Sequence, residues 1–118
     1  MPGDPSAWLD DLDACATACE DAFERLRSED CALAVSRLER DLVLAAAVTR
    51  TACGATEFGA YEGEALSTLL VLAAEVSERA AVSLAETGDE PLQTCREACL
   101  VAAAAARQLA PRQLSNGY

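Results

Sequence analysis

Apolar positions near the start of the chain recur at intervals of three and four residues, which places their side chains on one face of an α-helix. Within residues 9–26 these positions are Leu9, Leu12, Cys15, Cys19, Ala22, Phe23 and Leu26. Similar spacing returns in later segments. The four prolines stand at positions 2, 5, 91 and 111, so residues 6–90 contain none. Because proline is the strongest helix breaker, the pattern predicts an all-α protein.

Capping and turn residues divide the chain into four predicted helices. Ser28 is predicted to cap the N-terminus of the second helix, and Gly54 to end it. Asp89 is a natural N-cap for the fourth helix, and Pro111 is predicted to begin a short polar tail. The resulting helices cover about residues 6–26, 29–53, 64–86 and 90–109.

The number and length of these helices predict how they pack. A chain of 118 residues is predicted to form a single domain, residues 1–118. Four amphipathic helices joined by mostly short connections favour an antiparallel up-down-up-down four-helix bundle. In that topology the first and fourth helices are neighbours. The longest predicted connection is the glycine-rich segment 54–63.

Charge narrows the classes of partner. The formal net charge is −11, from 9 basic and 20 acidic residues. This charge argues against binding to nucleic acid or to an anionic membrane surface. The acidic N-terminus lacks the pattern of a signal peptide, and the apolar runs are shorter than a membrane span. The sequence therefore predicts a cytoplasmic protein whose thiols stay reduced. Helices so rich in alanine pack well against other helices, so association into a homo-oligomer or with a partner protein stays an open alternative.

The cysteines follow the same helical stripes as the apolar residues. The chain has six cysteines and no histidine. The segments CATACEDAFERL (15–26) and CREACLVAAAAA (95–106) each begin with Cys-x-x-x-Cys, a spacing of about one helical turn. A rise of about 1.5 Å per residue brings the two pairs to overlapping heights in the bundle. Five cysteines are thus expected in one half of the core: Cys15, Cys19, Cys31, Cys95 and Cys99. Cys53 is expected alone near the other end, as core filler.

Three explanations of the clustered cysteines stay open. They are a metal site, disulfide anchors or small core filler. Thiolates without imidazole select soft metals, so Cu(I) is favoured and Zn is an alternative. Iron–sulfur proteins typically use Cys-x-x-Cys spacing, and di-iron bundles need histidine; the chain has neither. The predicted metal ligands are Cys15, Cys19, Cys95 and Cys99, with Cys31 as a fifth.

Cysteines at this spacing inside a four-helix bundle resemble the bacterial copper storage proteins and their cysteine-rich relatives. In that family the fuller motif is Cys-x-x-x-Cys-x-x-Cys-x-x-x-Cys, and its thiolates hold many Cu(I) ions. Here the first two motif positions match in both segments, whereas the last two are Ala22 and Leu26, and Ala102 and Ala106. The predicted third helix has no cysteine, and Met1 is the only methionine. The resemblance therefore implies a few copper ions rather than bulk storage.

The leading hypothesis is a small cytosolic Cu(I)-binding bundle that uses core-facing thiolates. The alternative is a repurposed relative, with relic or disulfide-bonded cysteines, that binds a partner protein or a small molecule in a role such as biosynthesis. A thiol enzyme is disfavoured. Its candidate nucleophile, Cys31, follows Glu29 and Asp30, which oppose thiolate formation, and no histidine can act as base.

Overall fold

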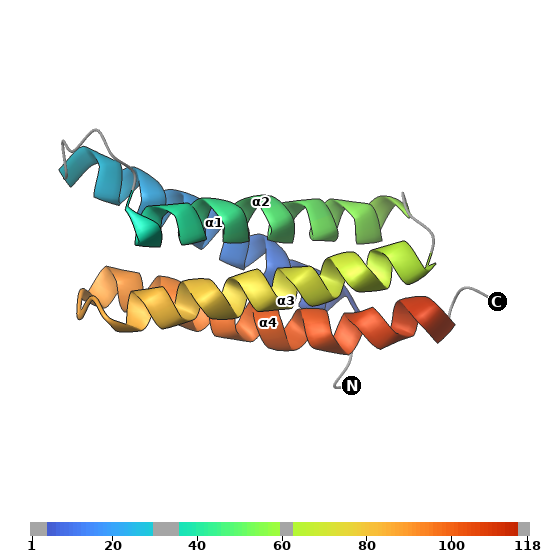
Figure 1. Ribbon diagram of the computed structural model, residues 1–118. Coiled ribbons are helices and arrows are strands. Elements are labelled where there is room, and N and C mark those ends of the chain that lie inside the picture. The colour runs from blue at the N-terminus through green and yellow to red at the C-terminus, as the bar shows by residue number, and fades with distance from the viewer. Residues whose placement is uncertain (1–4, 30–35, 60–62, 116–118) are drawn as a thin grey trace.

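Apolar stripes at helical spacing assemble into four helices in the computed structural model, which describes residues 5–29, 36–59 and 63–115. The helices are α1 (Pro5–Glu29), α2 (Arg37–Phe58), α3 (Gly63–Ala85) and α4 (Glu90–Ser115). Each helix packs against the next one in sequence, and α4 also packs against α1, so the four close into an antiparallel bundle (Figure 1). The predicted all-α four-helix bundle is confirmed.

The core combines a few leucines with many alanines. Leu12, Leu42, Leu70, Leu84 and Leu109 are almost completely buried and come from all four helices. Most other buried apolar residues are alanine, which lets neighbouring helix backbones approach closely. Within the described ranges, no helix has both the length and the apolar character needed to cross a membrane.

The predicted start of the second helix is wrong. Ser28 does not cap α2, because it lies inside α1, where its hydroxyl donates a hydrogen bond to the Arg25 carbonyl (2.9 Å). Ser36 is the N-cap instead. Its hydroxyl accepts from the Glu39 amide (3.1 Å), and the Glu39 carboxylate accepts from the Ser36 amide (3.0 Å). This reciprocal capping box satisfies two amides that helix formation would leave unpaired.

The predicted end of the second helix is also too early. Gly54 lies within α2, where a glycine costs only about 1 kcal/mol relative to alanine. The helix ends at Phe58, and Gly59 follows with a φ of 61° in the left-handed region. Glycine reaches that conformation without steric cost, and its amide donates to the Ala55 carbonyl. Residues 54–58 therefore belong to the helix and not to the predicted loop.

The bounds of α3 and the start of α4 lie within one residue of those predicted, but α4 does not end at Leu109. It continues through Pro111 to Ser115. Pro111 has no backbone N–H and therefore removes one intrahelical hydrogen bond. So close to the end of the helix, only a few more hydrogen bonds follow it. The Arg112 guanidinium also lies 4.7 Å from the centre of the Trp8 ring on α1, and this cation–π contact holds the last turns of α4 against the bundle.

The capping box leads to a stability prediction. The Ser36 amide and, secondarily, the Arg27 guanidinium (3.2 Å) hold the pKa of Glu39 below its usual value of 4.5. A carboxyl whose pKa is lowered on folding stabilises the native state above its unfolded pKa, and that stabilisation is lost as the pH falls through the folded pKa. Ser36→Ala is expected to lower the free energy of unfolding by about 1 kcal/mol at neutral pH, measured by urea denaturation.

The pH dependence supplies the control for this prediction. In both variants the backbone amide at position 36 still donates to the Glu39 carboxylate, so most of the stabilisation that is lost as the pH falls through the lowered pKa of Glu39 should be lost in both alike. An exposed serine away from a cap, Ser28, offers the comparison: Ser28→Ala should change stability much less. Equal costs for the two substitutions would contradict the role of the capping box.

Candidate metal centre

Two helices bring four cysteines into the core of the bundle. Cys15 and Cys19 lie one turn apart on α1, and Cys95 and Cys99 lie one turn apart on α4. All four side chains are buried, and only Cys95 keeps any exposure, at 3 %. The helical stripe puts each pair on the core face of its helix, and the packing of α1 against α4 makes the two pairs meet.

The sulfur atoms are in mutual contact. Cys99 Sγ lies 3.5 Å from Cys19 Sγ and 3.7 Å from Cys15 Sγ. The sulfurs of these three residues all lie within 4.8 Å of one another, which makes them the cysteine triplet of this structure. Cys95 Sγ lies 3.8 Å from Cys19 Sγ and extends the triplet toward the surface. Cys99 contacts both cysteines of α1, and Cys19 contacts both cysteines of α4.

The remaining two helices place hydroxyl groups beside the sulfurs. Ser77 of α3 is fully buried, and its Oγ lies 3.8 Å from Cys15 Sγ. Thr49 of α2 is also fully buried; its hydroxyl donates to the Ala45 carbonyl one turn earlier. Hydrogen bonding with the Ser77 hydroxyl favours the thiolate form of Cys15, whereas the Thr49 hydrogen is taken by the Ala45 carbonyl. The sulfurs therefore have polar neighbours in an otherwise apolar core.

The thiols share protons unequally. Hydrogen bonding with Cys19 and then with Cys99 lowers the pKa of Cys15, and hydrogen bonding with the same two residues lowers the pKa of Cys95. Hydrogen bonding with Cys15 raises the pKa of Cys19 and of Cys99, and burial raises both further.

The other two cysteines differ from this group. Cys53 lies outside the triplet: its Sγ is 3.5 Å from the Leu9 carbonyl oxygen and 3.9 Å from the Glu57 carboxylate. Burial, reinforced by the Glu57 charge, raises the pKa of Cys53 to about 11, so it stays a protonated core thiol. The fifth predicted ligand, Cys31, lies outside the described residues. Each of the five described cysteines is a free thiol.

Sequence reasoning assigned no part in the site to Ser77. The signal was present: Leu70, Ala73, Ser77, Ala80 and Leu84 share one face of α3 at helical spacing, and Ser77 is the polar residue on that face. A serine on an apolar stripe needs a hydrogen-bonding partner once it is buried. The sequence alone cannot show that this partner is the sulfur of a cysteine on another helix.

Similarity to known proteins gives no further guide to the chemistry of the cluster. No protein-family model matches the chain, and comparison with curated proteins and with solved structures finds no significant match. The case for a metal centre accordingly depends on the cysteines themselves. They supply a buried group of soft ligands, held by two helices and with the sulfurs already in contact.

Proposed function

We propose that this protein binds Cu(I) at the buried cysteine cluster. The observation that carries the proposal is the cysteine triplet, Cys15, Cys19 and Cys99, whose three sulfurs lie within 4.8 Å of one another in the core. Thiolates are soft ligands that favour Cu(I), and no imidazole is present in the chain to complete a mixed site. Cys95 is proposed as a further ligand, as is Cys31 from outside the described residues.

The sulfur spacing suits a metal ion without large rearrangement. A metal–sulfur bond of about 2.3 Å corresponds to sulfur–sulfur distances of about 3.8 Å in a tetrahedral site and about 4.0 Å in a trigonal one. The measured contacts of 3.5–3.8 Å are close to both values. Small shifts of the side chains would therefore open the cluster enough for an ion at its centre.

Cu(I) fits the arrangement better than Zn does. A structural zinc site requires four ligands around one ion, whereas the structure groups three sulfurs and leaves Cys95 in contact with Cys19 at the edge. Cu(I) accepts two or three thiolates. Ser77 beside Cys15 also supports a thiolate there, as a hydrogen-bonding neighbour that is not itself a ligand.

The core limits how many ions this site could hold. The resemblance to copper storage proteins supports a copper role. However, three of the four positions that would complete their motifs are alanines, Ala22, Ala102 and Ala106, and these are buried with the rest of the core. An ion between those alanines would have no ligand. We therefore propose binding of a few ions at the cluster, as expected of a buffer or carrier rather than a bulk store.

An anaerobic Cu(I) titration against a competing chelator tests this proposal. Wild-type protein is expected to take up Cu(I) with the near-ultraviolet absorbance of thiolate-to-copper charge transfer. The Cys15→Ala/Cys19→Ala variant is expected to lose most of that uptake, because it removes two of the three clustered sulfurs. Cys53→Ala is the matched control, since it removes a buried cysteine outside the triplet and should bind as wild type does.

Two results would count against copper binding. One is equal uptake by wild type and the Cys15→Ala/Cys19→Ala variant. The other is a thiol titration of unfolded, unreduced protein that finds fewer than the six thiols of the sequence. The second result would favour the alternative of disulfide-bonded cysteines in a protein that binds a partner or a small molecule.

A further inference from the structure

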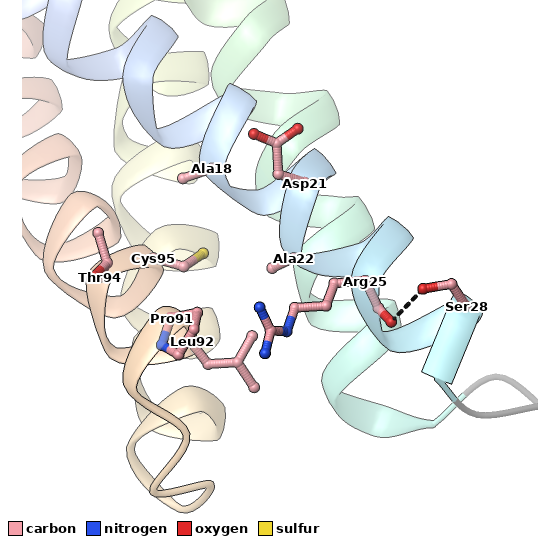
Figure 2. A pocket seen from close by; sticks show the side chains of 9 residues that line it. All are labelled: Ala18, Asp21, Ala22, Arg25, Ser28, Pro91, Leu92, Thr94 and Cys95. Carbon is pink, nitrogen blue, oxygen red and sulfur yellow. Dashed lines mark hydrogen bonds between the residues drawn. The ribbon is translucent and has the colours of Figure 1, made fainter.

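A pocket of about 490 Å³ opens between α1 and α4, beside the cysteine cluster. Figure 2 shows the sulfur of Cys95 directed from α4 into the space between the two helices. Cys95 is the member of the cluster that keeps some exposure, whereas Cys15, Cys19 and Cys99 keep none. The pocket is lined by Ala18, Asp21, Ala22, Arg25, Ser28, Pro91, Leu92, Thr94 and Cys95.

The sulfurs form a continuous path from this pocket into the core. Cys95 Sγ lies 3.8 Å from Cys19 Sγ, and Cys19 Sγ lies 3.5 Å from Cys99 Sγ. Cys99 Sγ is in turn 3.7 Å from Cys15 Sγ. An ion that reached Cys95 could pass to the triplet by exchanging one sulfur ligand for the next. It would not have to leave sulfur coordination on the way.

The walls of the pocket suit a small molecule. Ala18 and Ala22 on α1 are small and leave the space open. The Arg25 guanidinium extends from α1 toward Leu92 of α4 (Figure 2), and it is held by Glu29 at 3.3 Å and Asp89 at 3.8 Å. The volume is in the range that accommodates small ligands, and it is too small for a folded protein partner.

We propose that Cu(I) reaches the cluster through this pocket, carried by a small thiol, and that Cys95 is the first protein sulfur to bind it. This inference rests on the proposed copper function. In the transfer, a bond forms between copper and Cys95 Sγ while the bond between copper and the carrier sulfur breaks. The proton of the Cys95 thiol passes to the released carrier thiolate. Copper stays Cu(I) throughout, so no oxidant or reductant is needed.

A second pocket provides the competing route. It lies between α1 and α2, has a volume of about 610 Å³, and is lined by Cys19 together with Glu20, Asp21 and Glu24. No basic residue is among the described residues that line it. Glu20 is already paired with Arg50 at 2.7 Å, and Asp21 lines both pockets, so charge does not separate the two routes. Burial does: the Cys19 side chain is fully buried, whereas Cys95 keeps 3 % exposure, which favours the route past Cys95.

Rates of copper transfer from the Cu(I)–glutathione complex test the route, followed by stopped-flow absorbance without oxygen. Ala18→Leu narrows the proposed pocket without removing a sulfur, and it is expected to slow loading by at least roughly tenfold. Ala47→Leu is the matched control, because Ala47 is exposed and lines the competing pocket. It should change the rate by less than about twofold. Equilibrium affinity for Cu(I) should stay unchanged in both variants.

Further variants keep the test decisive. If Ala18→Leu does not fold, as judged by circular dichroism, Thr94→Leu narrows the pocket from the exposed side of α4 instead. In the metal-free protein, limited iodoacetamide treatment followed by peptide mass spectrometry should modify Cys95 before Cys15 and Cys99. This measurement reports access to the sulfur directly, without copper.

The outcomes separate this inference from the proposed function. Three results would overturn the route while leaving copper binding intact. The pocket variants could take up Cu(I) as fast as wild type, or Ala47→Leu could take it up slowly. The third is alkylation of Cys19 before Cys95. Absence of Cu(I) uptake by the wild-type protein at equilibrium would overturn both.

Discussion

Replacing Cys99 by alanine is expected to lower the affinity for Cu(I) by roughly 100- to 1,000-fold. Cys99 is the sulfur that contacts both Cys15 and Cys19, at 3.7 and 3.5 Å, so its loss leaves only the 3.8 Å contact between Cys95 and Cys19 to join the ligands of α1 and α4. The binding free energy of a metal site with about four ligands is about 10–16 kcal/mol, or about 2.5–4 kcal/mol per ligand. Losing one ligand's share of that free energy corresponds to the expected change in affinity. Competition with a Cu(I) chelator of known affinity measures it.

The fold should tolerate this substitution. Alanine already occupies the next two positions of the same α4 stripe, Ala102 and Ala106, and both are fully buried. Cys53→Ala serves as the control, because Cys53 is equally a buried cysteine but contacts the Leu9 carbonyl instead of another sulfur. If Cys99→Ala and Cys53→Ala bind Cu(I) equally well, the cluster is not the copper site.

Cu(I) is expected to raise the unfolding temperature of the wild-type protein by about 15 °C when free Cu(I) is about 1,000 times the dissociation constant. At that ratio, binding to the native state alone adds about 4 kcal/mol to the free energy of unfolding, and each kcal/mol corresponds to about 4 °C for a chain of this size. The linkage is strong because Cys15 and Cys99 are 84 residues apart in sequence. The unfolded chain therefore does not hold these ligands together.

Thermal melts followed by circular dichroism, with and without Cu(I) and in the absence of oxygen, measure the effect. The Cys15→Ala/Cys19→Ala variant is the control, and its unfolding temperature should not rise on addition of Cu(I). A wild-type protein that binds Cu(I) at equilibrium but melts at the same temperature would contradict a site built between α1 and α4. Such a result would place the copper on thiols that the unfolded chain presents equally well.

Local sequence was a good guide to the helices and a poor guide to three of their ends. Ser28 and Ser36 are both plausible caps, but only Ser36 has a glutamate three residues later to return the hydrogen bond. Gly54 and Gly59 are both candidate helix ends, and the chain takes the left-handed conformation at Gly59. Pro111 stays helical because its turn packs near Trp8. The capping box and the left-handed glycine are local signals, whereas the contact of Arg112 with Trp8 is made by a distant part of the chain.

The sequence by itself determined the helical class and the faces of the helices. Spacing of three and four residues places Cys15 and Cys19 on one stripe and Cys95 and Cys99 on another, whatever surrounds them. Periodicity along one helix, however, carries no information about the rotation or height of its neighbour. Only the packing of α1 against α4 decided that Cys99 touches both sulfurs of α1 and that Cys95 faces a pocket. The packing of α3 likewise decided that Ser77 meets Cys15.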